Sequence, residues 1–198
     1  MNMKRNLLSL SFLAFFGVSG TALAAASAPA QNDSSTANLE FTGKVTSSLC
    51  QVSTSDLNQS IKLGEVSATA LGNGGKSPAQ SFTVTLNNCA TNTGTINYVF
   101  SDTNGSPGTT SYLVPLAGDT SASGVGVYLE KSDGKAITIG QTNNIDVTKG
   151  ADGTSALPQQ SIPLKAYIGK INSSATVIPG DVTANAVMTI RTVESTSP

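Results

Sequence analysis

Short segments in which apolar and polar residues alternate one by one are the feature that most constrains the fold of this chain. In residues 39–45, for example, Leu39, Phe41, Gly43 and Val45 are separated by single polar residues. A period of two is the spacing of a strand with one apolar face. We predict strands, the third of them only weakly, at residues 39–45, 49–52, 61–64, 82–86, 96–100, 125–129, 136–139, 162–168 and 186–192. Short strands separated by Gly, Asn and Asp turns are typical of a sandwich or barrel. No twelve-residue segment shows a helical period, so we expect one all-β domain.

The first 24 residues have the pattern of a secretory signal peptide. Lys4 and Arg5 precede an apolar run over residues 7–16, and Ala22-Leu23-Ala24 is a small-residue cleavage site. At 1.5 Å per residue this run is about 15 Å long, about half of a hydrocarbon core of roughly 30 Å. We therefore expect a signal peptide at 1–24, a flexible leader with a first strand at 25–46, and a sandwich domain at 47–198.

The two cysteines, Cys50 and Cys89, are expected to form a disulfide. An exported chain reaches an oxidising compartment, where paired cysteines are joined. Closing a loop of about 40 residues stabilises a fold by roughly 4 kcal/mol in the chain-entropy model. A catalytic cysteine needs activation by His or by C-x-x-C spacing, and this chain has neither.

Composition excludes several classes of function. The chain contains no His, which excludes Ser-His-Asp catalysis, imidazole metal ligands and a proton switch near neutral pH. Eleven basic and 12 acidic residues give a net charge of -1, so there is no basic footprint for nucleic acid. Only 12% of the residues are charged, about half the usual quarter, which is typical of secreted β-structure. We expect no cofactor.

Two local motifs resemble ligand sites and are better explained as loops. Residues 70–77 come close to a phosphate loop, but that loop needs a helix after it, and here Pro78 and a predicted strand follow. Asp102 and Asn104 begin like a calcium loop but lack its further acidic ligands and closing Glu. We expect a flexible Gly-rich loop at the first site and a turn at the second.

The order of these features carries a resemblance to a known family. Residues 38–45 resemble the start of mature chaperone–usher pilins, the type 1 and P-type fimbrial subunits. As in that family, a cysteine, Cys50, follows a few residues later, and a second cysteine comes about forty residues after it. The resemblance continues through residues 82–89 and 125–129 to the last alternating segment. It therefore covers nearly all of the chain after the signal peptide.

This resemblance implies an immunoglobulin-like β-sandwich that lacks its last strand and is completed by donor-strand complementation. A periplasmic chaperone fills the resulting groove first, and at the outer-membrane usher the next subunit's amino-terminal strand replaces it. By position, the donor residues are Ala37, Leu39, Phe41, Gly43 and Val45. The acceptor groove is walled by the first strand after the donor segment and by the last strand, including Ala186, Met188 and Ile190. The alternation alone is equally consistent with residues 39–45 being an ordinary first strand of their own domain.

The carboxyl terminus departs from the family pattern. Family members usually end with an aromatic residue, most often Tyr, next to last in the final strand. Here Thr192 occupies the nearest equivalent place, and the chain continues to Pro198. This difference leaves open how the terminus engages a chaperone and which fimbrial system is involved.

The function implied is a structural, non-enzymatic subunit of a chaperone–usher fimbria. It would be exported through the periplasm, polymerise by donor-strand exchange with neighbouring subunits, and build a fibre for cell adhesion on the bacterial surface. The alternative is a single-domain secreted adhesin or carbohydrate-binding module, although 4 Tyr and no Trp offer few aromatic platforms. A secreted hydrolase is a third hypothesis, for which the sequence offers no set of catalytic residues. Whether the subunit forms the rod or a minor component stays open.

Overall fold

The computed structural model describes residues 39–40, 49–105 and 108–195. The chain divides into two units, Met1–Lys44 and Val45–Pro198. Within the first unit only Leu39 and Glu40 are described; both are exposed and neither belongs to a helix or strand. The expected signal peptide, and the expected donor residues Ala37, Phe41, Gly43 and Val45, lie outside the described residues.

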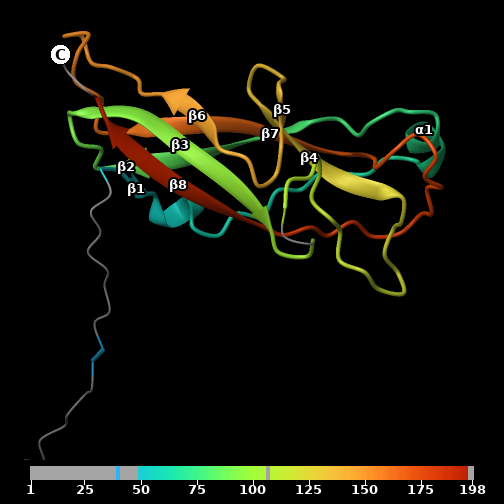
Figure 1. Cartoon of the computed structure of the whole chain (residues 1–198). Coiled ribbons are helices and arrows are strands. Elements are labelled where there is room, and N and C mark those ends of the chain that lie inside the picture. Colours follow the sequence, from blue (N-terminus) through green and yellow to red (C-terminus); the bar gives the residue numbers. More distant parts are fainter. Residues whose placement is uncertain (1–38, 41–48, 106–107, 196–198) are drawn as a thin grey trace, which may run out of the picture. The chain divides into compact units, whose positions relative to one another are not determined.

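The described part of the second unit contains two antiparallel sheets, as Figure 1 shows. The large sheet has the strand order β1-β2-β7-β4-β5 and the small sheet has the order β6-β3-β8. The strands are β1 (Gln51–Val52), β2 (Gln80–Asn87), β3 (Thr93–Asp102), β4 (Val125–Lys131), β5 (Ala136–Ile137), β6 (Asn143–Asp146), β7 (Gln160–Lys170) and β8 (Ala186–Glu194). A 3-10 turn, η1 (Thr54–Asp56), and a short helix, α1 (Ala68–Gly72), lie between β1 and β2. The expected all-β architecture is confirmed.

The longer alternating segments became strands as predicted. Five of them are strands that are longer than expected: 82–86 is part of β2, 96–100 of β3, 125–129 of β4, 162–168 of β7 and 186–192 of β8. Two others are only partly paired: 49–52 contains β1, and 136–139 contains β5. The prediction missed β6, which has a single apolar residue, Ile145. The weak prediction at 61–64 was wrong, because this segment has no pairing partner in the described structure.

The core lies between the two sheets and follows the period of two. Ile96, Tyr98 and Phe100 point inward from β3, and Ile162 and Leu164 point inward from β7; each is at most 5% exposed. Burying each large apolar side chain contributes roughly 1.5–3 kcal/mol. The alternation read from the sequence is therefore the pattern that brings the sheets together.

The expected disulfide joins Cys50 to Cys89, and both side chains are buried. Next to it, the carbonyl of Leu49 accepts a hydrogen bond of 2.7 Å from the N–H of Ala90. The N–H of Leu49 donates to the hydroxyl of Thr192 at 3.1 Å. Thr192 thus holds the start of the domain to the end of β8.

The two loop motifs serve the fold. The expected loop at residues 70–77 is wrong in its first part, because residues 70–72 are the end of α1 and only Gly74 and Gly75 follow the helix. The buried Ser77 hydroxyl accepts the Ile168 N–H at 2.9 Å. The carboxylate of Asp102 accepts the N–H groups of Asn104 and Val114 at 2.9 and 2.7 Å, which makes the expected turn. Within the described ranges no three His, Cys, Asp or Glu residues gather to hold a metal ion. No helix in those ranges has the length and apolarity to cross a membrane.

Candidate functional site

The candidate site is the free edge of β8. Among the described residues, β8 pairs with β3 alone and so ends the small sheet. Towards the β3 side, the carbonyls of Asn185 and Thr183 accept the N–H groups of Thr103 and Leu116. Backbone groups alternate between the two edges of a strand. Those of the even-numbered residues from 182 to 190 therefore face the open edge, which is a template for one more strand.

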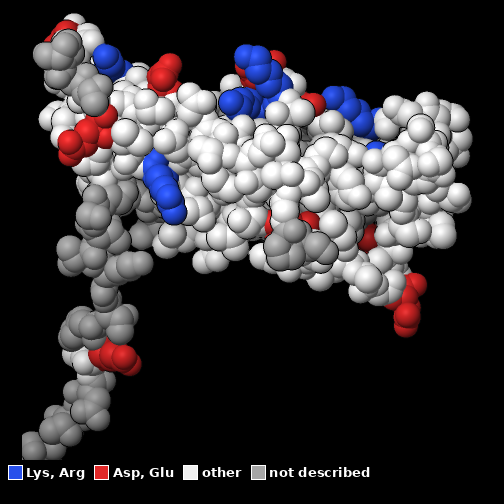
Figure 2. Space-filling model, viewed as in Figure 1, with Lys and Arg blue, Asp and Glu red and all other residues white. Residues whose placement is uncertain are grey.

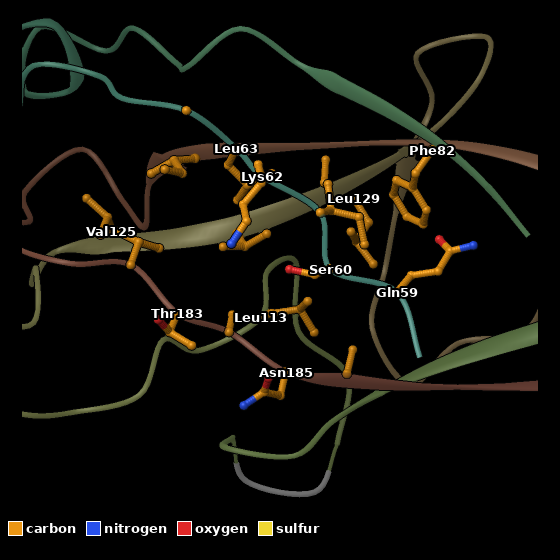
Figure 3. Close-up of a pocket in the computed structure, with 18 of the residues that line it drawn as sticks. Gln59, Ser60, Lys62, Leu63, Phe82, Leu113, Val125, Leu129, Thr183 and Asn185 are labelled. Carbon is orange, nitrogen blue, oxygen red and sulfur yellow. The ribbon is translucent and has the colours of Figure 1, made fainter. Parts of the chain in front are cut away.

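A groove of about 1610 Å³ runs along this edge. One wall is β8 with the segment that leads into it, from Val177 to Ile190, and the other wall is the segment 57–66. Figure 3 shows Gln59, Ser60, Lys62 and Leu63 on one side, Thr183 and Asn185 on the other, and Val125, Leu113 and Leu129 between them. Each wall has ten or more residues, which corresponds to a length of at least about 33 Å in extended chain. The groove is therefore long enough for a strand.

The groove leads directly to the core. Its floor is formed by side chains of both the large and the small sheet and of the loop before β4: Val84, Phe100, Leu113, Val125, Val127, Leu129, Ala166 and Ile168. Each of these is buried, whereas Met188 and Ile190 on the β8 wall are only half-buried. At the mouth, Leu57 is 62% and Ile178 is 54% exposed. An apolar side chain that entered would thus complete the contacts of the core.

The residues expected to form the acceptor wall are all present in this groove. Ala186, Met188 and Ile190 line it from β8. The opposite wall differs from the expectation of a first strand, because β1 contributes only Val52 and most of the wall is the segment 57–66. Sequence reasoning also missed the stretch 177–184, where the half-buried Val182 and Ala184 continue the alternation of β8 upstream.

Side chains, rather than strand pairing, hold the wall 57–66 against β2. The amide of Gln59 donates to the carbonyl of Thr83 at 2.8 Å. The carboxylate of Asp56 accepts the N–H of Thr85 at 2.7 Å, and this hydrogen bond lowers the pKa of Asp56. Among the described residues, the main-chain groups of this wall form no hydrogen bond with other backbone groups, so a strand in the groove would find partners on both sides.

Charged side chains are sparse around this site. Figure 2 shows that the face over β3 and β8 is mostly uncharged. The charged residues that line the groove are Asp56, Lys62, Glu65 and Asp181. The groove therefore selects its occupant mainly by apolar shape, with a few charges at its rim.

Comparison with known proteins identifies the family. A sequence model described as Fimbrial protein matches residues 39–192. The chain belongs to the fimbrial protein family. It is 49% identical over 195 residues to Fimbrial protein 987P of Escherichia coli, covering 96% of this chain and 97% of that protein.

Solved pilus subunits share the fold of this fimbrial protein. A structure of a chaperone–usher pilus matches with a TM-score of 0.60 and 21% identity, covering 79% of this chain and 94% of the other. The crystal structure of the P pilus rod subunit PapA matches with a TM-score of 0.59 and 19% identity, covering 73% and 99%. The fold is therefore the immunoglobulin-like sandwich of pilins, as expected from the sequence, and no strand of the described residues covers the free edge of β8.

Three tyrosines cluster at the large sheet, away from the groove. Tyr128 stacks on Tyr167 with ring centroids 5.3 Å apart, and Tyr112 lies 5.7 Å from Tyr128. The ammonium of Lys76 covers the ring of Tyr167 at 4.4 Å. The cluster is explained by packing, because the rings lie against one another and a Cβ at Gly169 would lie 3.0 Å from the Tyr128 ring.

Tyr128→Ala should destabilise the domain by about 2–3 kcal/mol, because it removes two ring contacts and uncovers Gly169. Tyr128→Phe is the matched control: it keeps the ring and loses only the hydrogen bond of 2.8 Å to the Lys170 carbonyl, at a cost of about 0.5–1.5 kcal/mol. Urea unfolding of the subunit with a peptide strand bound in its groove, followed by circular dichroism, gives both values. Equal losses in the two variants would contradict a packing role for the ring.

Proposed function

We propose that this fimbrial protein is a structural subunit of a chaperone–usher fimbria that polymerises by donor-strand exchange. The observation that carries the proposal is the apolar groove along the open edge of β8, in a chain that also contains the alternating segment 37–45. An added strand gains main-chain hydrogen bonds, and its alternate side chains fill pockets. Leu39, Phe41 and Val45 together would contribute some 5–9 kcal/mol before ordering costs.

The same arrangement explains the order of assembly. An unfilled groove exposes core residues and an open sheet edge, both of which promote aggregation. We infer that residues 1–24 direct export, that a periplasmic chaperone fills the groove of domain 47–198, and that residues 37–45 of the next subunit replace it at the outer-membrane usher. The fibre then stands on the cell surface. The subunit's work is assembly, and the proposal includes no catalytic step and no cofactor.

The test is the state of the purified subunit. Co-expression with its chaperone should give a one-to-one complex, and the subunit alone should aggregate or polymerise. One control is needed, because the leader of an isolated subunit is able to fill the groove of the same molecule. A variant with Leu39→Ser and Phe41→Ser removes that route. If this variant were a stable, monodisperse monomer without chaperone, the sandwich would be complete and the proposal wrong.

A further inference from the structure

We infer that residues 37–45 of a second copy of this chain bind the groove in one register, which places Lys44 beside Asp181. The inference rests on the proposed function and adds the partner and a residue pair that selects it. The other possible occupants, a different subunit or a different register, are outcomes of the test described below.

The direction of the added strand follows from the small sheet. In this sheet β3 pairs antiparallel with β6 on one side and antiparallel with β8 on the other. The strand that an immunoglobulin-like sandwich has beside its penultimate strand is also antiparallel to it. Residue numbers of paired positions therefore rise along one strand as they fall along the other.

The alternation of side chains then restricts the register to steps of two. Val182, Ala184, Met188 and Ile190 pack against the core, while Asp181, Thr183 and Asn185 are exposed. The apolar positions of the donor segment are odd-numbered, from Ala37 to Val45. Side chains of directly paired residues lie on the same face. Each apolar donor residue must therefore pair with an even-numbered residue of the β8 wall.

The extent of the groove places the donor segment. Its β8 wall runs from Val177 to Ile190 and is centred near Ala184. Beyond Ile190, the hydroxyl of Thr192 is bonded to Leu49 of the same domain. Centring the segment 37–45 on this wall pairs Phe41 with Ala184.

This register also matches large residues with small ones. It pairs Ala37 with Met188, Leu39 with Ala186, Phe41 with Ala184 and Gly43 with Val182. Shifted two residues one way, Phe41 meets Val182 and Gly43 meets Gly180. Shifted the other way, Leu39 meets Met188, and Gly43 meets only Ala184. Close packing disfavours the pairs of two large residues, Phe41 with Val182 and Leu39 with Met188, because they are crowded. It also disfavours the pairs of Gly43 with Gly180 or Ala184, because they leave space unfilled.

Charge gives an independent argument for the same register. The outward residue Lys44 falls beside Asp181, whose side chain is exposed and whose backbone groups bond Thr120 and Ala122 away from the open edge. Among the described residues, the structure gives the carboxylate of Asp181 no ion pair. The shifted registers place Lys44 beside Thr183 or Pro179 instead.

One further register would also join opposite charges, by placing Glu40 beside Arg191. It would pair Leu39 with Thr192, where Leu49 is already bound, and carry Ala37 past the groove to Glu194. The groove and the charges therefore agree only for Lys44 beside Asp181. Because that pair is not hydrogen-bonded through its main chain, its Cα atoms lie about 4.5 Å apart.

Cross-linking tests the register. A peptide of residues 37–46 with Lys44→Cys is exchanged into chaperone-bound full-length subunits carrying Asp181→Cys, Thr183→Cys or Pro179→Cys, and is then oxidised. Non-hydrogen-bonded cross-strand positions suit a disulfide. We expect the cross-link at position 181, located by mass spectrometry together with the native Cys50–Cys89 bond. A bound peptide that cross-links mainly at 179 or 183 overturns the register and leaves the proposed function intact. A peptide that never displaces the chaperone overturns both.

Charge reversal tests the pair itself. Lys44→Glu in the peptide should weaken displacement of the chaperone about 1.4- to 5-fold, the range of a cross-strand ion pair. Asp181→Lys in the subunit should restore it. Glu65→Lys is the matched control, because Glu65 is an exposed carboxylate that lines the same groove from the opposite wall. Absence of rescue by Asp181→Lys, or equal rescue by Glu65→Lys, would overturn the assignment of Asp181 as the partner.

Discussion

A subunit carrying Gly43→Arg should fold and bind its chaperone, yet fail to assemble into fibres. In the proposed register Gly43 lies beside Val182, and a large side chain there meets packed core. Overpacking costs typically 1–3 kcal/mol, and a buried unpaired charge costs more. A loss of at least tenfold in donor binding is therefore expected. Electron microscopy of cells that express the variant as their sole copy checks the loss of fibres.

Peptide exchange separates this result from misfolding. A native peptide of residues 38–46 should displace the chaperone from the purified subunit, and the same peptide with Gly43→Arg should not. Thr42→Arg is the matched control, because it places the same side chain on the outward face, where it should displace nearly as well as the native peptide. If residues 39–45 were an ordinary first strand, the variant subunit would instead misfold before it reached any partner. Equal displacement by the native and Gly43→Arg peptides, or displacement by neither, would remove the donor assignment.

The strands that could be predicted are those whose two faces differ most. In β7, the buried Ile162, Leu164 and Ala166 alternate with residues that are more exposed, and the alternation is visible in the sequence alone. β6 could not be predicted, because it is polar and is held by pairing with β3 rather than by an apolar face. The alternation of apolar and polar residues indicates which side chains are buried. It gives no indication of a strand that is held by main-chain pairing alone.

The candidate site was predictable on one side only. Ala186, Met188 and Ile190 stand in a clear alternating segment, and the pilin resemblance assigned them to the acceptor wall. The opposite wall, residues 57–66, has the weak alternation of Ile61 and Leu63 but no strand. Under the proposed function the pairing partner of this wall is supplied by another molecule, which leaves too little signal for a prediction from one chain. The donor segment itself rests on sequence alone, because apart from Leu39 and Glu40 it lies outside the described residues.

Loss of the disulfide should have the second large effect. Cys50→Ser or Cys89→Ser should lower the free energy of unfolding by about 2–5 kcal/mol and reduce the yield of subunit in the periplasm. Both side chains are buried, so each variant also places a hydroxyl in the core. The double variant Cys50→Ala with Cys89→Ala is the control that avoids both the free thiol and the hydroxyl. Urea unfolding of the peptide-filled subunit measures the change, and thiol labelling of the parent should find no free cysteine.

The position of this disulfide predicts that its loss also damages the groove. The loop that it closes contains the whole wall 57–66, which few hydrogen bonds hold to β2. Without the bond, hydrogen bonds alone hold the start of this wall to the end of β2, so we expect the wall to be less ordered before a strand binds. The Cys→Ala double variant should therefore bind the donor peptide more weakly than the parent, even at urea concentrations where both remain folded. Unchanged peptide affinity with lowered stability would show that the disulfide constrains the unfolded chain but does not shape the groove.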